Sequence, residues 1–340
     1  MRTSEPWLAT VLPVLNEEAH IEACLQSLLC QSLPANEHII MVLDGGSTDA
    51  TKDIINTIQS GLKPNQHPVL HLLDNPGRFV PHARNLALQQ LPDSITHVLE
   101  FNGHIEVEPT HLVDLKRIWD RLESDHPQLA GLGCRVLGSE MRQGRMEQII
   151  DSTLRSPLGG STGQFAVFNQ EGPTNVPAFA LHRRMALETI GGWDESFLTS
   201  QDSDLSMRLK KAGFDLFRTP DVVVNMRRRT SFKSWFLMSH RYGFWRTKVL
   251  LKHPQRIVLR EFLPLLGLIG ISVLLMFSPP LAIIPVFAYA IVLLLTGISH
   301  FRKGLQNVLG VPLCLVLLHT GFTIGLIDGL IRKGGASKDR

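Results

Sequence analysis

The pattern of apolar and polar residues divides the chain near residue 260. Up to residue 101, apolar runs of strand length alternate with stretches whose apolar residues recur at helical spacing. The strand-like runs are 9–15, 38–44, 68–74 and 95–101, and the helical stretches are 17–31, 49–60 and 80–91. This alternation predicts βαβ units and an α/β fold in which a mostly parallel sheet is covered by helices on both faces.

The middle of the chain has a weaker pattern. Residues 156–165 are rich in glycine and predict a loop, whereas 183–192 and 202–214 predict short helices that end at glycine. Ligands on open α/β sheets bind at the carboxyl ends of the strands. The polar residues that follow the predicted strands are therefore candidates as a group, and they lie at 16–17, 44–46, 74–75 and 102–104.

Three apolar segments follow residue 260, at 262–277, 281–298 and 307–331. The last two are long enough to cross a bilayer, while the first, at 16 residues, is marginal against the roughly 20 that a span needs. If the N-terminus is cytoplasmic, three spans place the basic C-terminal tail outside, which the positive-inside bias disfavours. Either the third segment is re-entrant, so that it enters and leaves the membrane on the same side, or the chain has one span fewer.

The charge distribution strengthens the membrane interpretation. Residues 1–221 carry 18 Lys and Arg against 28 Asp and Glu, whereas 222–260 carry ten basic residues and no acidic one. Each basic residue beside an anionic membrane contributes about 1 kcal/mol to binding, although such a run can also be a solvated surface. We predict a catalytic domain at 1–221, a basic aromatic interfacial segment at 222–260, two or three membrane helices at 261–331 and a basic tail at 332–340.

Several protein classes are disfavoured. The four cysteines have no metal or redox spacing, which fits a reduced, cytosol-facing protein, and the N-terminus does not resemble a signal peptide. The sequence contains no Walker loop, zinc cluster, dinucleotide fingerprint or Gly-x-Ser-x-Gly elbow. The basic segment has no nucleic-acid reader motif, so we expect no nucleic-acid partner.

The most specific passage is "VLPVLNEEAHIEACLQSLLCQ" followed by "IIMVLDGGSTDAT". It resembles the nucleotide-sugar transferases of glycosyltransferase family 2, and the resemblance continues through "DNPGRFVPHARNLAL", "VPAFALHRRMALETIGGWDESF" and "SQDSDLSMRLKKAGF". Within that family, "DNPGR", "SPLGG" and "HRYGFWR" are most similar to membrane-bound exopolysaccharide enzymes of the succinoglycan (ExoA) type. The resemblance implies a Rossmann-like GT-A domain and an inverting transfer from a nucleotide sugar.

The expected nucleotide contacts lie in the first hundred residues. Asp44 ends an apolar strand, and the two glycines after it leave room for a base and a ribose beside a carboxylate that accepts hydrogen bonds. The resemblance adds Pro13, Glu17, Arg84 and Asn102 to this group. Glu17 can instead be a first-turn helix acid, and Arg84 a surface arginine.

The expected catalytic base is Asp202. An inverting transfer needs a carboxylate that takes the proton of the attacking acceptor hydroxyl, and Asp202 matches the family residue with this role. Asp204 competes for the role but can instead cap the helix. Gln201 stands where the family often has Glu, and the pair Asp194 and Glu195 belongs to the acceptor side of the pattern.

The basic segment offers phosphate ligands. Arg229, Arg241 and Arg246 could grip a pyrophosphate, because guanidinium forks match phosphate oxygens, and Trp245 lies among them. The alternative is an interfacial helix with Lys, Arg and Trp at headgroup level.

The family's acidic metal frame is replaced by Asn102-Gly103-His104. Neutral imidazole binds Mn²⁺ and similar ions, whereas Mg²⁺ prefers oxygen ligands. We therefore expect His104 to bind a divalent metal, with Mn²⁺ preferred over Mg²⁺. The alternative is a simple strand-end histidine.

Together these features predict an inverting glycosyltransferase that moves a sugar, from a UDP-sugar or another nucleotide sugar, to a lipid-linked or polymeric saccharide in cell-surface polysaccharide synthesis. We expect a multi-pass protein of the inner membrane with a cytoplasmic catalytic domain and with polysaccharide-assembly partners. The alternatives are a polyprenyl-phosphate glycosyltransferase and a non-catalytic membrane subunit that retains the fold.

Overall fold

The computed structural model describes residues 5–64, 66–138, 144–160 and 168–332. The chain forms two compact units. The catalytic unit comprises residues 1–139 and 162–227, and the helical unit comprises residues 140–161 and 228–340. The boundary expected at residue 221 falls inside a strand of the catalytic unit, so that unit extends to Arg227.

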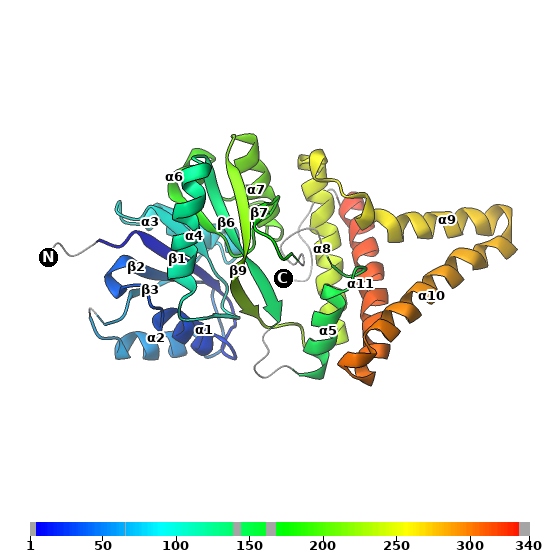
Figure 1. The fold of residues 1–340 in the computed structure, drawn as a ribbon, viewed down its shortest axis with the longest axis horizontal. Coiled ribbons are helices and arrows are strands. Elements are labelled where there is room, and N and C mark those ends of the chain that lie inside the picture. The colour runs from blue at the N-terminus through cyan, green and yellow to red at the C-terminus, as the bar shows by residue number, and fades with distance from the viewer. Residues whose placement is uncertain (1–4, 65, 139–143, 161–167, 333–340) are drawn as a thin grey trace. The chain divides into compact units, whose positions relative to one another are not determined.

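The first half of the catalytic unit is a parallel sheet with the order β3-β2-β1-β4 (Figure 1). The strands are β1 (Leu8–Val14), β2 (His38–Asp44), β3 (Val69–Asp74) and β4 (His97–Glu100). Every residue of β2 is buried, as expected for a parallel strand that is covered on both faces. The predicted βαβ pattern is confirmed over this region.

Beyond β4 the sheet becomes mixed. The added strands are β5 (Ile105–Val107), β6 (Leu129–Gly138), β7 (Gly172–Pro173), β8 (Leu181–Arg183) and β9 (Asp215–Met226). Strand β8 runs antiparallel to both β4 and β6, and β9 runs parallel to β6 but antiparallel to β5 and β7. The parallel arrangement predicted for the sheet therefore holds in its N-terminal half.

Helices cover both faces of this sheet (Figure 1). One apolar layer includes side chains of α1 (Ile21–Leu29), α2 (Thr51–Gly61) and α4 (His111–Asp125), and the other includes those of α3 (Val80–Gln90), α6 (Arg184–Thr189) and α7 (Gln201–Lys211). Alternate residues of β1 serve the two layers: Leu12 belongs to the first and Val11 to the second. The sheet therefore separates two hydrophobic clusters, one on each face.

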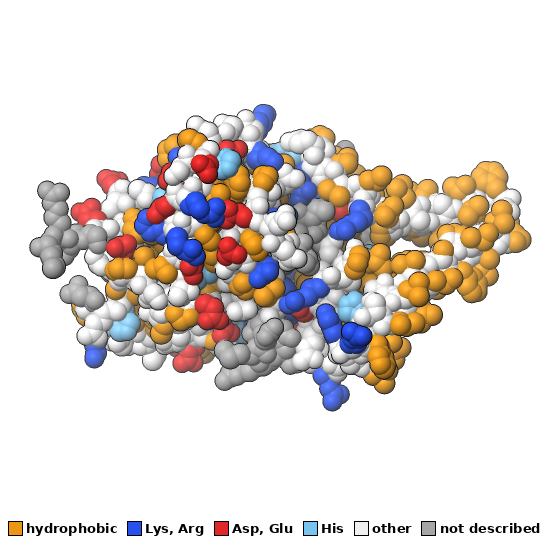
Figure 2. Space-filling model, in the orientation of Figure 1, with side chains coloured by type: hydrophobic (Ala, Val, Ile, Leu, Met, Phe, Trp, Pro, Cys, Tyr) orange, Lys and Arg blue, Asp and Glu red, His pale blue; other side chains and the backbone are white. Residues whose placement is uncertain are grey.

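The helical unit contains α5 (Arg145–Arg155), α8 (Phe232–Lys252), α9 (Leu263–Phe277), α10 (Ile283–Ser299) and α11 (Leu305–Ile331). Within the described residues, three helical segments are long and apolar enough to cross a membrane: Leu259–Phe277, Pro279–Ser299 and Leu305–Ile331. Figure 2 shows hydrophobic side chains over the surface of α9 and α10. Short 3-10 turns lie at Ala35–Glu37, Pro254–Arg256, Leu259–Phe262, Pro279–Ala282 and Phe301–Lys303.

Candidate active site

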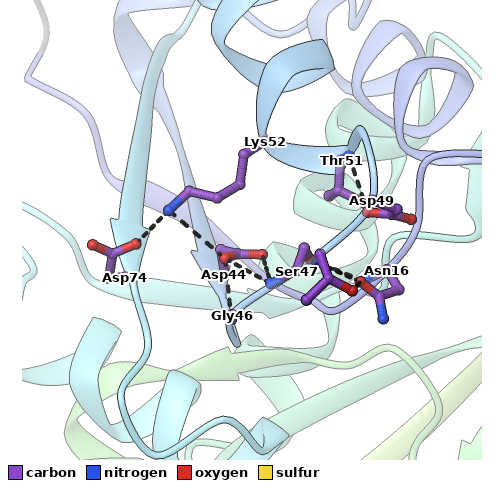
Figure 3. Close-up of polar contacts among 9 residues, drawn as sticks. Asn16, Asp44, Gly46, Ser47, Asp49, Thr51, Lys52 and Asp74 are labelled. Carbon is purple, nitrogen blue, oxygen red and sulfur yellow. Dashed lines mark hydrogen bonds and ion pairs between the residues drawn. The ribbon is translucent and has the colours of Figure 1, made fainter.

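Asp44 ends β2 and organises the loop that follows it (Figure 3). Its side chain is buried, and its two carboxylate oxygens accept hydrogen bonds from the backbone N–H groups of Gly46 (3.1 Å) and Ser47 (3.1 and 3.2 Å). Asp44 was expected to meet the base of a nucleotide. These contacts shape the loop beside β1, and the contact of Asp44 with a nucleotide base stays a prediction.

The same loop is fastened to the end of β1. Asn16 accepts a hydrogen bond from the Thr48 N–H at 2.8 Å, and its own N–H donates to Ser47 Oγ at 2.9 Å (Figure 3). Asn16 has a left-handed backbone (φ 54°), a conformation that asparagine tolerates better than most residues. Asp49 accepts from the N–H and hydroxyl groups of Thr51, so it stabilises the start of α2 as expected for a capping residue. Pro13 lies in β1, in register with Leu43 of β2.

Lys52 adds a positive charge that the sequence patterns did not identify. Its Nζ lies 2.7 Å from Asp74 at the end of β3 and 3.9 Å from Asp44 at the end of β2 (Figure 3). The two aspartates are register partners in neighbouring parallel strands. Without the lysine, two carboxylates would face each other at this edge of the sheet.

Arg84 is not the surface residue considered from the sequence. Its side chain is 4% exposed, and Nη1 lies 3.2 Å from Oε2 of Glu100, which is equally buried. The other oxygen of Glu100 lies 3.3 Å from His182 Nε2. Burial opposes the ionisation of Glu100, but Arg84 and His182 outweigh it and hold the pKa of this carboxyl below its ordinary 4.5. Arg84 therefore forms an internal ion pair with Glu100, and its contact with a nucleotide stays a prediction.

Asn85 of α3 forms hydrogen bonds with the segment before α7. Its side-chain amide donates to the Trp193 carbonyl at 2.8 Å and to Glu195 at 3.0 Å, while its oxygen accepts from the Trp193 N–H. Asp194 accepts from the Ser196 N–H at 2.9 Å. These contacts orient the loop that contains Asp194 and Glu195, and their role towards the acceptor stays a prediction.

Asp202 and Asp204 occupy different environments in the first turn of α7. Asp204 is fully buried and pairs with Arg208 at 2.8 Å. Asp202 is partly exposed, as is its neighbour Gln201, and both follow Ser200, which has a left-handed backbone (φ 60°). Although Asp202 keeps some exposed surface, desolvation of its carboxyl group, reinforced by the negative charge of Glu100, raises its pKa from 3.8 to about 6. A carboxyl group with such a pKa suits proton transfer near neutral pH.

His104 lies close to the residue that was expected to contact the nucleotide, Glu17. The His104 Nδ1 atom is 2.9 Å from Glu17 Oε1, and both side chains are partly exposed. Histidines that bind metals commonly hold a carboxylate with one ring nitrogen and the metal with the other. The partly exposed Asn102 is two residues away. In the described part of the chain no group of three His, Cys, Asp or Glu side chains could hold a metal ion.

The four candidate phosphate ligands of the basic segment belong to the helical unit. Trp245 is buried against Phe244, and Arg246 is 8% exposed, with its Nε 2.6 Å from Glu261. Arg241 is partly exposed in α8, and Arg229 is exposed just before that helix. The contacts of Arg246 with Glu261 and of Trp245 with Phe244 lie within the helical unit, and phosphate binding by these residues stays a prediction.

Sequence comparison decides the family. The description Glycosyl transferase family 2 matches residues 10–191, and Glycosyl transferase family group 2 matches residues 115–327. The chain belongs to glycosyl transferase family 2. The first match includes the loop at Asp44, the Arg84–Glu100 pair and His104.

Two characterised relatives extend along nearly the whole chain. A dolichyl N-acetyl-alpha-D-glucosaminyl phosphate 3-beta-D-2,3-diacetamido-2,3-dideoxy-beta-D-glucuronosyltransferase of Methanococcus voltae is 26% identical over 98% of this chain and 99% of its own length. The succinoglycan biosynthesis protein ExoA of Rhizobium meliloti is 29% identical over 93% of this chain and 92% of its own. The expected resemblance to ExoA-type proteins is confirmed.

A solved structure supports the GT-A fold. The mannosyltransferase PcManGT from Pyrobaculum calidifontis, in complex with GDP-Man and Mn²⁺, superposes with a TM-score of 0.58 over 97% of this chain and 88% of its own. The sequences are 16% identical, so this likeness establishes the fold alone.

Proposed function

We propose that this protein is an inverting, membrane-bound glycosyltransferase that moves a sugar from a nucleotide sugar to a hydroxyl group of a lipid-linked or polymeric saccharide. The observation that carries the proposal is Asp202, a partly exposed carboxylate whose pKa is about 6 at the start of α7. Family membership supplies the reaction class. The relatives named for a dolichyl-linked acceptor and for succinoglycan biosynthesis support this acceptor class.

In this proposal Asp202 accepts the proton of the acceptor hydroxyl as its oxygen attacks the anomeric carbon and the nucleoside diphosphate leaves. The Asp44 loop and Lys52 form the donor side at the ends of β2 and β3. Arg84 and Glu100 act on Asp202 through their charges: Glu100 raises the pKa of Asp202, and Arg84 lowers it. Asp204 is excluded from the base role by its burial and its pairing with Arg208.

A divalent metal fits the donor set, with Mn²⁺ preferred over Mg²⁺. With Nδ1 turned towards Glu17, His104 keeps its other ring nitrogen for a metal ion, and Asn102 offers an amide oxygen. Imidazole suits Mn²⁺ better than Mg²⁺. When bound, such an ion would neutralise charge on the leaving diphosphate. The Mn²⁺ in the PcManGT complex supports the choice of ion.

We place the catalytic unit in the cytoplasm and the apolar helices in the inner membrane. The acidic catalytic domain, the basic segment at 222–260 and the apolar helices support this arrangement. Association with other polysaccharide-assembly proteins is part of the same proposal.

The test is a transfer assay on membranes that contain the protein, with a panel of UDP- and GDP-sugars, in the presence of Mn²⁺, Mg²⁺ or a chelator. Asp202→Asn should abolish transfer while leaving nucleotide binding intact. Asp215→Asn is the matched control, because Asp215 is an exposed aspartate at the start of β9. Undiminished transfer by Asp202→Asn would disprove the base assignment.

Two further arms separate the alternatives. Polyprenyl phosphate supplied as the sole acceptor tests for a simpler phosphate acceptor, and product formation there would replace the saccharide acceptor. Nucleotide binding that is insensitive to Mn²⁺, without transfer or hydrolysis of any donor, would identify a non-catalytic subunit.

A further inference from the structure

The three apolar helices of the helical unit differ in how much of their surface is covered. The most apolar window of Leu259–Phe277 has 0% of its residues buried, that of Pro279–Ser299 has 11%, and that of Leu305–Ile331 has 44%. The three segments are similar in length and composition, but the last one is much more buried than the first two. Helix α11 therefore has a partner that α9 and α10 do not share over most of their length.

The exposed side chains of α11 form one stripe. They recur every three or four residues, which is the spacing of a single helix face. The stripe consists of Leu305, Leu309, Leu313, Val316, Thr320, Ile324, Ile327, Leu330 and Ile331. The opposite face is buried, and it includes Gly310, which lies against Ile149 of α5.

Helices α8 and α11 touch backbone to backbone. A Cβ atom added to Gly321 would lie 3.0 Å from the Phe236 carbonyl oxygen, and one added to Gly329 would lie 2.7 Å from that of Phe244. Between them, Gly325 abuts the His240 carbonyl even more closely. Since contact positions increase together along both helices, α8 and α11 run parallel to each other. Glycines at four-residue spacing permit this close approach.

Side chains extend this parallel contact at both ends. Trp235 Nε1 donates to the Cys314 carbonyl at 2.9 Å, and Thr247 Oγ1 donates to the Leu326 carbonyl at 2.9 Å. The paired part of α8 thus spans residues 235–247, about 18 Å at 1.5 Å per residue. If α11 crossed the bilayer, this part of α8 would have to lie in the bilayer beside it.

The composition of α8 opposes that position. The helix carries Lys233, Arg241, Arg246, Lys248 and Lys252. Each lysine or arginine at the centre of a bilayer costs about 2.5–3.5 kcal/mol on insertion scales. Arg241 and Arg246 lie within the paired part of α8, residues 235–247, and Arg246 forms an ion pair with Glu261.

Helices α9 and α10 have the opposite character. Each apolar segment joins a four-residue 3-10 turn to an α-helix of 15 residues in α9 or 17 residues in α10. At about 2.0 Å per residue in the turn and 1.5 Å in the α-helix, the segments measure about 31 and 34 Å, close to the roughly 30 Å hydrocarbon core. Large apolar side chains are exposed around them, including Phe277 at 81% and Met276 at 79%. Figure 1 shows that α9 and α10 extend away from the α8–α11 pair and meet at a common tip, the turn at Ser278.

We propose that the α9–α10 hairpin crosses the lipid bilayer and returns, while α11 lies with α5 and α8 along the membrane surface with its apolar stripe against the acyl chains. Both ends of the chain then face the same side. This arrangement puts the basic turn at Arg302 and Lys303 and the basic C-terminal tail together, as the positive-inside bias prefers. It does not depend on the proposed transferase reaction.

The experiment uses full-length protein in sealed membrane vesicles of known orientation. Cys24, Cys30, Cys134 and Cys314 are replaced by alanine, and single cysteines are introduced in separate variants at Ser4, Ser278 and Ser337. A membrane-impermeant maleimide should label Ser4→Cys and Ser337→Cys in inside-out vesicles, and Ser278→Cys in right-side-out vesicles. Detergent should expose all three, which controls for folding and reactivity.

Labelling of Ser337→Cys from the side opposite to Ser4→Cys would overturn the proposal, since it requires a third span. Failure of Ser278→Cys to react from that opposite side would overturn the hairpin crossing. A fluorophore at Thr320→Cys provides a second readout. Spin-labelled lipids should quench it best when the label is near the headgroup, and they should quench an Ile291→Cys fluorophore in α10 best when the label is deep. Deep quenching at Thr320 would also refute the surface position of α11.

Discussion

The raised pKa of Asp202 predicts where activity is lost on acidification. A base must be ionised to accept a proton, so kcat/KM should rise with pH and level off above the pKa of about 6. For a single group with that pKa, the ionised fraction is about 0.9 at pH 7 and about 0.1 at pH 5, a loss of roughly tenfold. With the ordinary pKa of 3.8, more than about nine-tenths would remain ionised at pH 5. The two cases differ by an easily measured factor.

Glu100→Gln tests the cause of the shift. After burial, the charge of Glu100 is the largest contribution that raises the pKa of Asp202, while Arg84 lowers it. Removing the negative charge and leaving Arg84 in place should therefore move the acid limb of the kcat/KM profile to lower pH. The assay is the full pH profile with the donor at subsaturating concentration, in parallel with nucleotide binding at each pH. This binding measurement separates titration of the base from loss of the fold.

The matched control is Glu123→Gln, because Glu123 pairs with Arg183 but is 43% exposed. Its acid limb should stay at the wild-type position. Glu100→Gln also leaves the buried Arg84 with an unpaired charge, so we expect the variant to be less stable by about 3–5 kcal/mol. A wild-type acid limb below about pH 5, or a limb that moves to higher pH in Glu100→Gln, would refute this account of Asp202.

Two further predictions concern the metal and the helix pair. Glu17→Gln should lower Mn²⁺ affinity by about 10–100-fold, because it removes the carboxylate partner of His104, and electron paramagnetic resonance of free Mn²⁺ measures this affinity. The control Glu22→Gln changes an exposed residue of α1 and should leave the affinity unchanged. Equal affinities in both variants would argue against a metal at His104. Gly325→Leu should destabilise the helical unit by at least about 1–3 kcal/mol, measured by thermal unfolding in detergent, because its side chain would meet the His240 carbonyl. Thr320→Leu on the exposed stripe is its control, and similar unfolding temperatures for the two variants would contradict the close α8–α11 contact.

The sequence predicted the first half of the sheet well because the apolar residues of each strand and helix there follow the pattern typical of that element. Strands β1 and β2 are runs of mostly buried, apolar residues, and α1 to α3 carry apolar residues at helical spacing. The later strands were missed for a physical reason. Strand β8 has three residues, and β9 pairs with neighbours from distant parts of the chain, so their local pattern carries little of the information that fixes them.

The site was predicted residue by residue, but the contacts between residues were not. Arg84 and Glu100 are 16 positions apart in the sequence, and the residues around each one do not indicate that the two form an ion pair. One signal was present: Glu100 is a charged residue inside the apolar run "THVLEF", and a buried charge needs a counter-charge. A search for partners of such residues would have identified Arg84 as a candidate counter-charge for Glu100.

Helix α5 has a consequence for making and shortening this protein. It belongs to the helical unit, although the residues before and after it in the chain belong to the catalytic unit. Its apolar side chains Ile149 and Ile150 pack in one cluster with Val311 and Leu315 of α11. During synthesis the ribosome releases α5 long before α11 exists to cover it. A fragment that ends at Arg227 would keep this exposed surface permanently, so a soluble catalytic fragment requires residues 140–161 to be replaced by a short polar linker.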